Sequence, residues 1–192
     1  MLGWRGDPCG GGCLCDCHAR ATAGGCPPPH GNRRAGGRVG GDEGRDPAGG
    51  DRRGMTVFLD TAVFMYAGGR EHPLRVPCRA LLERAVAGEL DAATSAEVVQ
   101  EILHRFVAIR RPELGAAMAR DVLAAFEPVL PITHGVVRRM PDLIERHPSL
   151  VARDLIHVAT CLEEGIGTIV SPDRGFDEVR EIRRLDPTAT ET

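Results

Sequence analysis

The sequence contains no lysine, so all 24 of its basic residues are arginines. Against 27 Asp and Glu residues, this leaves a formal net charge of −3. Binding of nucleic acid through bulk positive charge is therefore excluded, whereas a local arginine patch is not. Because glycine is also abundant, with 24 residues, the lack of lysine is typical of a GC-rich coding sequence. A single arginine is for that reason weak evidence of a binding site.

Long apolar runs are missing as well. No stretch approaches the ~18 apolar residues that a membrane-spanning helix needs. The first residues do not combine a basic segment with an apolar one, as a secretory signal would. We therefore expect a cytoplasmic protein that does not associate with a membrane. Aromatic residues are scarce at 4 %, but the hydrophobic fraction of 42 % is enough to build a core.

The composition changes abruptly at Met55. Residues 1–54 contain 16 of the 24 glycines and 5 of the 7 cysteines, but only three branched apolar residues, Leu2, Leu14 and Val39. Such a segment cannot bury enough apolar surface to offset the entropy lost when its backbone is ordered. We expect residues 1–54 to be a disordered leader, or to precede a true start at Met55. Residues 55–192 are then expected to form a single domain.

The cysteines and histidines of the leader leave a second interpretation open. Thiolates and imidazoles can bind zinc, but their spacing here matches no paired C-x-x-C motif and they have no apolar neighbours. Disulfide bonds are less favoured still, because the rest of the chain has only Cys78 and Cys161 and resembles a cytosolic protein. Disorder remains the preferred interpretation. The residues concerned are Cys9, Cys13, Cys15, Cys17, His18, Cys26 and His30.

Residues 55–192 alternate short strand-like runs with longer helix-like segments. Apolar and β-branched runs predict strands at residues 56–59, 91–93, 129–133, 167–170 and 182–185. Apolar periodicity, with Gly and Pro at the ends, predicts helices at residues 76–87, 95–111, 113–126, 135–146 and 150–164. A turn is expected at residues 61–67. Strands separated by helices favour an α/β fold, a parallel sheet with helices on both faces.

Four carboxylates are expected at one edge of this sheet. Asp60 directly follows the first strand, and Asp173 lies three residues beyond the strand at 167–170. Ligands bind at the carboxyl ends of parallel strands. Glu101 and Asp154 each lie about 60° from the edge of an apolar helix stripe, at ~100° per residue. Converging, half-buried carboxylates repel one another unless a cation is present, and oxygen ligands favour Mg²⁺ or Mn²⁺ over Zn²⁺.

Each of these acids also has a purely structural explanation. Asp60 can cap the following turn, and Glu101 can be a solvated helix residue. Asp154 can stabilise its helix through the helix dipole, and Asp173 lies in a sequence typical of a β-turn. For any one acid the structural explanation is the better one. The combination of two strand ends and two stripe edges favours an acidic site.

The same residues resemble a known family. The segments VFLDTAVFMYA, SAEVVQEILHR, SLVARDLIHVATCLEEG, TIVSPDRGFDEV and IRRLDP, in this order, are similar to PIN-domain proteins, and among these to the VapC toxins of bacterial toxin–antitoxin pairs. The resemblance covers Met55 to about Pro187. It implies a three-layer α/β/α sandwich and a Mg²⁺- or Mn²⁺-dependent endoribonuclease. The acids of the family map onto Asp60, Glu101, Asp154 and Asp173, with Asp177 as a weaker fifth metal ligand.

The resemblance also implies a mechanism. Metal bound by the acids would lower the pKa of a water and polarise the phosphodiester, leaving a 5′-phosphate and a 3′-hydroxyl. The hydroxyl that usually precedes the last acid is present as Ser171. His104 and His157 are interpreted as surface or core-edge residues in preference to contacts with RNA or with an acid. The candidate phosphate contacts are Arg105, Arg153 and Arg174.

The expected partners are RNA, a second copy of the chain and a cognate antitoxin. A basic antitoxin tail would lie across the acidic edge, with the helices at 76–87 and 95–111 as its apolar floor. The floor candidates are Leu81, Val99, Leu103 and Phe106. Two alternatives stay open. One is a PIN nuclease of RNA processing without an antitoxin. The other is a non-catalytic receiver-like domain, which the complete absence of lysine disfavours.

Overall fold

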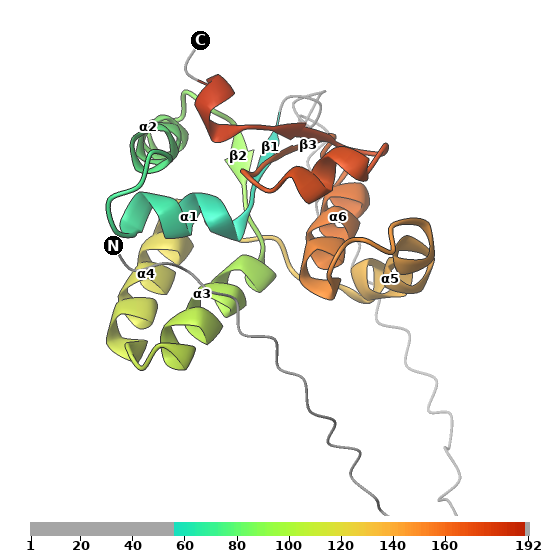
Figure 1. Cartoon of the computed structure of the whole chain (residues 1–192), viewed down its shortest axis with the longest axis horizontal. Helices are drawn as coiled ribbons and strands as arrows, with labels where there is room; N and C mark the ends of the chain where they lie inside the picture. Colours follow the sequence, from blue (N-terminus) through green and yellow to red (C-terminus); the bar gives the residue numbers. More distant parts are fainter. Residues whose placement is uncertain (1–55, 191–192) are drawn as a thin grey trace, which may run out of the picture. The chain divides into compact units, whose positions relative to one another are not determined.

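The structure is a computed structural model that describes residues 56–190 (Figure 1). The expectations for residues 1–54, the disordered leader and its zinc-binding alternative, fall outside these residues. None of the described helices is long and apolar enough to cross a lipid bilayer.

A four-stranded parallel sheet lies at the centre of the described residues. Its strands are β1 (Val57–Leu59), β2 (Ala92–Ala93), β3 (Thr168–Val170) and β4 (Arg183–Leu185), in the order β2-β1-β3-β4. Phe58 of β1 is in register with Ile169 of β3, and Ile169 is in register with Arg184 of β4. Four of the five predicted strands are therefore confirmed, and all run parallel, as predicted.

The fifth predicted strand, at residues 129–133, is wrong. Here Leu130 forms only an isolated bridge with Ser95. Pro131 lies in the middle of the run and has no N–H group to donate to a ladder. Proline was thus the signal in the sequence that argued against a strand.

Six α-helices of the described residues flank the sheet. They are α1 (Thr61–Gly68), α2 (Arg75–Val86), α3 (Ala96–Ala108), α4 (Pro112–Ala125), α5 (His134–Arg146) and α6 (Ala152–Glu164). The 3₁₀ helix η1 (Arg174–Glu178) lies between β3 and β4, and the 3₁₀ helix η2 (Pro187–Thr190) follows β4. Neighbouring helices pack in pairs, α1 with α2, α3 with α4 and α5 with α6. In Figure 1, α1 to α4 gather at the left of the view and α5 and α6 at the right. Contacts between α3 and α6 join the two groups.

Helix α1 replaces the turn expected at residues 61–67. Nearly every residue of its sequence is apolar, so no polar face marks the helical period. Val63, Phe64 and Ala67 are buried. Tertiary packing on both sides, and not an amphipathic pattern, therefore determines this helix.

The core is built from the central strands and α6. Phe58, Leu59 and Ile169 of the strands are fully buried, as are Leu155 and Ala159 of α6. Apolar periodicity predicts one stripe on the helix at 95–111, which includes Ile109, and one on the helix at 150–164, which includes Val151 and Leu155. These stripes are only partly correct. Val151, which precedes α6, and Ile109, which follows α3, are 57 % and 47 % exposed, because each lies where its helix has already left the core.

Replacing Leu155 with alanine should lower the free energy of unfolding by about 2–5 kcal/mol, because the change leaves a cavity under the sheet. Val151→Ala, in the same predicted stripe but exposed, should change it by less than about 0.5 kcal/mol. Urea unfolding followed by circular dichroism measures both. Equal losses for the two variants would contradict the observed packing of α6.

Candidate metal-binding active site

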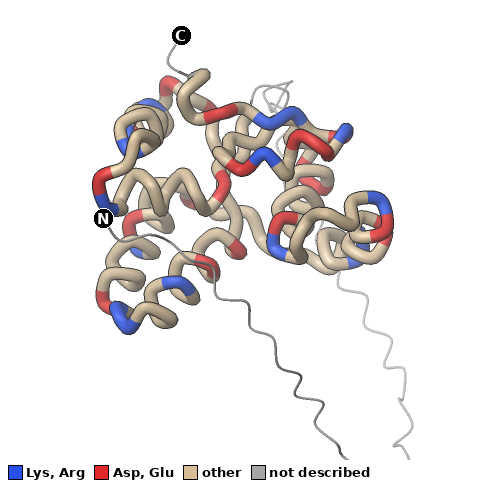
Figure 2. The backbone as a smooth tube through the Cα atoms, in the orientation of Figure 1, with Lys and Arg blue, Asp and Glu red and all other residues tan. Residues whose placement is uncertain are grey.

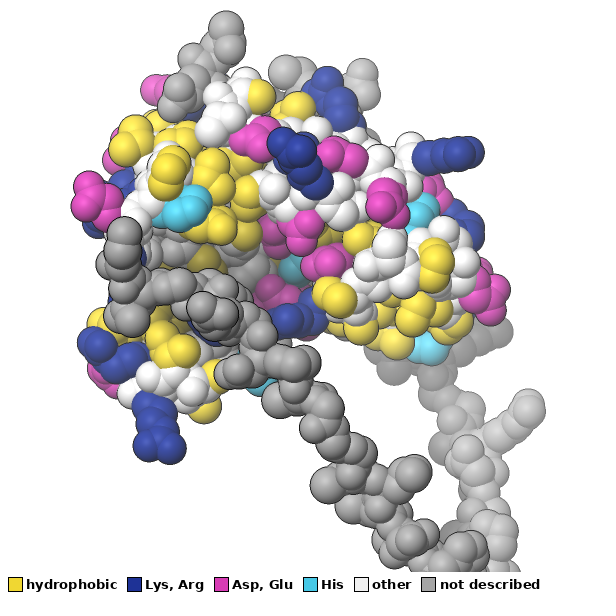
Figure 3. Space-filling view, viewed as in Figure 1, with side chains coloured by type: hydrophobic (Ala, Val, Ile, Leu, Met, Phe, Trp, Pro, Cys, Tyr) yellow, Lys and Arg dark blue, Asp and Glu magenta, His cyan; other side chains and the backbone are white. Residues whose placement is uncertain are grey.

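Asp60, Glu101, Asp154 and Asp173 line one open cavity of about 380 Å³. They come from the end of β1, from α3, from α6 and from the loop between β3 and η1. Figure 2 shows acidic residues of separate elements meeting near the middle of the domain, and Figure 3 shows acidic side chains around a hollow in this face. The remaining lining residues are Thr61, Ala62, Met65, Tyr66, Arg105 and Arg153.

Asp60 is the most buried of the four acids. It occupies the N-cap position of α1, yet its side chain makes no capping hydrogen bond. Instead the Ser171 hydroxyl donates to Asp60 Oδ2 at 2.6 Å. Capping, the structural explanation considered for Asp60, is therefore not the role of its carboxylate.

Ser171 connects the ends of the two central strands. Its hydroxyl donates to Asp60 and also accepts from the backbone N–H of Asp173 at 3.0 Å. Asp173 in turn accepts from the N–H of Gly175 at 2.8 Å and caps η1. The turn expected around Asp173 is thus present, and the same turn places its carboxylate at the cavity.

His157 lies behind the acids and is only 1 % exposed. Its Nε2 atom is 3.6 Å from Asp60 Oδ1 and 3.8 Å from Glu101 Oε2. Its ring packs against Phe58, with 5.4 Å between the ring centroids. The interpretation as a surface or core-edge histidine is therefore wrong for His157, whereas His104 is exposed as expected.

The acids thus have partial counter-charges of their own. Besides His157, Arg153 approaches Glu101, with 3.5 Å between Nε and Oε1. Burial is the largest influence on the pKa of Glu101 and would raise it, but His157, Thr61 and Arg153 outweigh burial and lower this pKa. For His157, burial would lower the pKa, but Glu101 and Asp60 raise it above its ordinary value.

Asp60 and Asp154 have pKa values shifted in the opposite direction to that of Glu101. Burial raises the pKa of Asp60, against the influence of His157 and Ser171. Burial and the neighbouring carboxylates of Asp173 and Asp60 raise the pKa of Asp154 to about 6. The cavity therefore holds carboxylates whose charge the protein only partly neutralises.

Asp177 has a different environment. Its carboxylate forms a two-pronged pair with Arg184, at 2.7 Å from Nε and 3.1 Å from Nη2. The hydrogen bonds from Arg184 hold its pKa below the ordinary value. Arg184 also donates to the Ser171 carbonyl at 2.9 Å and approaches Asp186 at 3.4 Å. Asp177 therefore supports the loop that carries Ser171, and it is not among the residues that line the cavity.

Sequence reasoning missed Arg184 and the place of His157. The only signals were the IRRLDP segment, in which two arginines stand side by side, and the i+3 spacing between Asp154 and His157. Neither signal tells which neighbouring element the side chain meets.

The donor set fits a hard divalent cation. Four carboxylates face one cavity, two of them with a raised pKa, and carboxylate oxygen is the ligand that Mg²⁺ and Mn²⁺ prefer. Among the described residues, no three His, Cys, Asp or Glu side chains already lie close enough together to hold an ion. Ligation would therefore require some of these side chains to turn toward a common point.

Asp154→Asn should raise the thermal stability of the metal-free protein at pH 7 by at most a few degrees, since the half-buried side chain is screened by solvent. The pKa of Asp154 is about 6 in the folded protein, against an ordinary 3.8. The folded state therefore binds the proton more tightly, and stability falls as the pH rises through this window. The gain of the variant should vanish below about pH 4, where the carboxyl is protonated in both states.

Thermal unfolding in EDTA between pH 4 and pH 8 measures this difference. Asp142→Asn, at an exposed position of α5, is the control and should leave the melting temperature unchanged across the range. A loss of stability in Asp154→Asn at pH 7 would contradict the repulsion.

Comparison with known proteins agrees with this arrangement. The model of the PIN domain family matches residues 57–182. Ribonuclease VapC13 of Mycobacterium tuberculosis is 37 % identical over 129 residues, which cover 67 % of this chain and 98 % of that protein. Ribonuclease VapC23 of the same species is 40 % identical over 118 residues, covering 61 % and 92 %.

Solved structures show the same fold. FitAcB from Neisseria gonorrhoeae matches with a TM-score of 0.56 and 19 % identity, over 69 % of this chain and 98 % of that one. VapBC2 from Rickettsia felis, bound to a DNA fragment from its promoter, matches with a TM-score of 0.55 and 15 % identity, over 68 % and 98 %. The expected α/β/α sandwich with a parallel sheet is confirmed. With its acids, its sheet and these relatives, the chain belongs to the PIN-domain family and, within it, to the VapC-like proteins.

Proposed function

We propose that residues 55–192 form a Mg²⁺- or Mn²⁺-dependent endoribonuclease, the cytoplasmic toxin of a VapBC-like toxin–antitoxin pair. The observation that carries the proposal is the meeting of four carboxylates from four separate elements in one cavity. Relatives named ribonuclease support the choice of RNA as substrate. The metal would be held by Asp60, Glu101, Asp154 and Asp173.

A bound Mg²⁺ or Mn²⁺ would supply Lewis-acid activation of water and of the phosphodiester. The residues of the chain prepare the site for it. The Ser171 hydroxyl donates to the Asp60 carboxylate, and His157 approaches it at 3.6 Å. Arg105 and Arg153 line the same cavity and would bind RNA phosphates. Arg174, the third candidate phosphate contact, begins η1 and is not among the lining residues.

Loss of a metal ligand should abolish RNA cleavage. Asp60→Asn, Glu101→Gln and Asp154→Asn should each reduce the rate ~100-fold or more, and EDTA should do the same until Mg²⁺ or Mn²⁺ is restored. Cleavage of a labelled RNA measures the rate. Cleavage that persists undiminished in EDTA would contradict the metal proposal.

The proposal predicts a smaller effect for Asp177 than for Asp173. Asp177→Asn should keep most of the activity, because its partner is Arg184, whereas Asp173→Asn should lose it. An equal loss in both variants would make Asp177 a ligand, as the resemblance first suggested.

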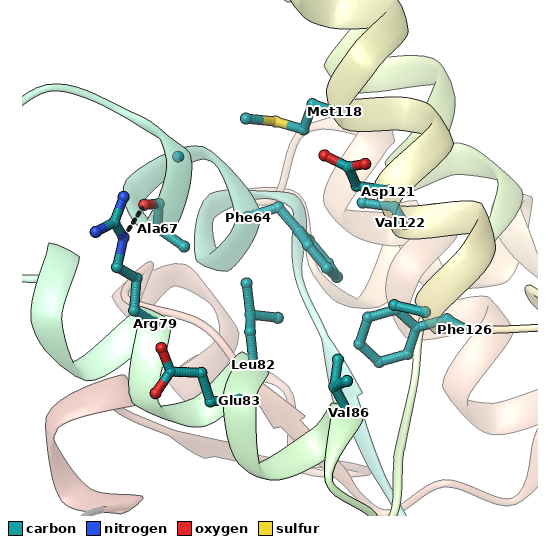
Figure 4. A pocket seen from close by; sticks show the side chains of 12 residues that line it. Phe64, Ala67, Arg79, Leu82, Glu83, Val86, Met118, Asp121, Val122 and Phe126 are labelled. Carbon is teal, nitrogen blue, oxygen red and sulfur yellow. Dashed lines mark hydrogen bonds between the residues drawn. The ribbon is translucent and has the colours of Figure 1, made fainter.

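An antitoxin is the proposed partner, and an apolar groove supports it. A cavity of about 370 Å³ lies between α1, α2 and α4 (Figure 4). Apolar side chains form its floor, and its charged lining residues are Glu83, Asp121 and one arginine, Arg79, so that acids outnumber bases. An amphipathic segment with basic residues would fit such a surface. The apolar lining residues are Phe64, Ala67, Leu82, Val86, Met118, Val122, Ala125 and Phe126.

This groove differs from the floor predicted from the sequence. The predicted floor lay at the acidic edge, between the helices at 76–87 and 95–111, whereas this separate groove is lined by α1, α2 and α4. Leu81 is 1 % exposed and belongs to the core. Crystal structures of VapBC proteins give the partner further support, and a homodimer remains part of the proposal.

Co-expression with the product of a small upstream reading frame should give a stable complex without RNase activity. Val86→Glu places a charge in the groove and should weaken co-purification at least about tenfold while leaving RNA cleavage intact. Val76→Glu is the matched control, since Val76 lies on the same helix, is 71 % exposed and does not line the groove.

Affinity purification and an RNase assay read out both variants. An upstream product that neither co-purifies nor inhibits would contradict the toxin proposal. The remaining function would then be that of a PIN nuclease in RNA processing.

A further inference from the structure

The only tyrosine of the chain stands at the acidic cavity. Tyr66 lines the cavity together with Thr61, Ala62 and Met65, which places all four on one face of α1. Asp60 lies six positions earlier in the chain, about 9 Å along the helix axis. Tyr66 therefore lines the same cavity that would hold a phosphodiester at the acids.

Tyr66 does not stand alone. Its ring stacks on that of His72, with 4.5 Å between the centroids and 29° between the planes. The Nδ1 atom of His72 accepts a hydrogen bond from the Leu74 N–H at 3.2 Å, which fixes the orientation of the imidazole. His72 is exposed and Tyr66 half-buried, so this pair presents an aromatic surface to solvent beside the cavity.

This pair differs from the other ring pairs in residues 56–190. Phe58 packs on His157 and Phe64 on Phe126, and all four of these rings are buried in the core. The Tyr66–His72 pair is thus the ring stack of the described residues that a ligand can reach.

The net negative charge of the domain makes such an aromatic surface useful for binding RNA. Residues 55–192 carry 16 arginines against 21 acids, and the cavity itself is lined by four carboxylates. Bulk attraction for a polyanion is therefore weak, and contacts with the bases would add affinity that the overall charge does not supply. Single-stranded RNA is commonly held by stacking its unpaired bases on aromatic side chains.

We propose that Tyr66 and His72 form a stacking subsite for an unpaired nucleobase next to the scissile phosphodiester. The proposal rests on the ribonuclease function proposed above. The base stacks on the exposed side of the pair, while Arg105 and Arg153 of the same cavity bind the phosphates. Because purines offer the larger stacking surface, the subsite favours a purine.

Kinetics of the full-length protein test the subsite. In Mg²⁺, Tyr66→Leu should raise KM for a single-stranded RNA roughly five- to hundredfold, with kcat little changed. Tyr66→Phe keeps the ring and should restore the KM of the unchanged protein. His72→Ala should give a smaller rise, whereas His134→Ala, at an exposed histidine at the start of α5, should give none.

Fluorescence supplies a second measurement. The chain has one tryptophan, Trp4, and one tyrosine, so in a full-length Trp4→Phe protein the ultraviolet emission reports on Tyr66. In EDTA, hexa-adenylate should quench this emission more strongly than hexa-uridylate at equal concentration, after correction for absorbance. Both measurements are repeated in His72→Ala, which changes only an exposed loop residue and does not depend on Tyr66 variants folding.

The outcomes separate the two proposals. An unchanged KM in Tyr66→Leu and His72→Ala, with a lower melting temperature, would show that the stack only holds the loop between α1 and α2, and would overturn the subsite. Cleavage of RNA with these unchanged KM values would leave the ribonuclease proposal standing. Failure of the unchanged protein to cut RNA in either metal would instead remove the ribonuclease proposal and the subsite with it.

Discussion

The arrangement of the cavity depends on one buried carboxylate. Asp60 directly follows the strand β1 and is buried, and this burial and the neighbouring Glu101 raise its pKa. The Ser171 hydroxyl meets it from the exit of β3, and His157 meets it from α6. Ser171 also accepts a hydrogen bond from the backbone N–H of Asp173, and His157 lies on the same helix, α6, as Asp154. The groups around one carboxylate thus belong to the segments that carry two more, and the parallel sheet and α6 together bring these acids to one cavity.

Local patterns in the sequence predicted most of the elements and the convergence of the four acids at one cavity, because strand ends and helix stripes are short-range features. These patterns gave wrong or incomplete predictions where contacts with other elements determine the structure. The apolar sequence of α1 has no period to recognise, and only tertiary contacts make it a helix. The partners of His157, Asp60 and Glu101, lie far away in the sequence, and no local pattern tells that Arg184 meets Asp177 seven residues earlier. A spacing of three residues puts His157 near Asp154 along the chain, but it cannot tell that the ring points at Asp60 in the core.

Helix α1 lines two different surfaces, and this explains why its sequence has no polar face. Thr61, Met65 and Tyr66 face the acidic cavity, while Phe64 and Ala67 face the groove between α2 and α4. Two surfaces of different chemistry therefore share one helix of eight residues. If a ligand in the groove moved α1, it would also displace Asp60, because Asp60 is the N-cap residue of α1. A partner bound in the groove would then affect the acids without covering them.

The guanidinium of Arg184 makes four contacts in different directions, two to Asp177 and one each to Ser171 and Asp186. A planar, branched donor can do this, whereas the single ammonium of a lysine cannot. Genome base composition can exchange arginine for lysine at many surface positions. At Arg184 this exchange would not be neutral, because these contacts would be lost. In relatives encoded by AT-rich genomes we expect lysine to replace most surface arginines but arginine to persist at this position of β4. Where other arginines have been replaced by lysine, a retained arginine at the position of Arg184 would therefore indicate a structural role.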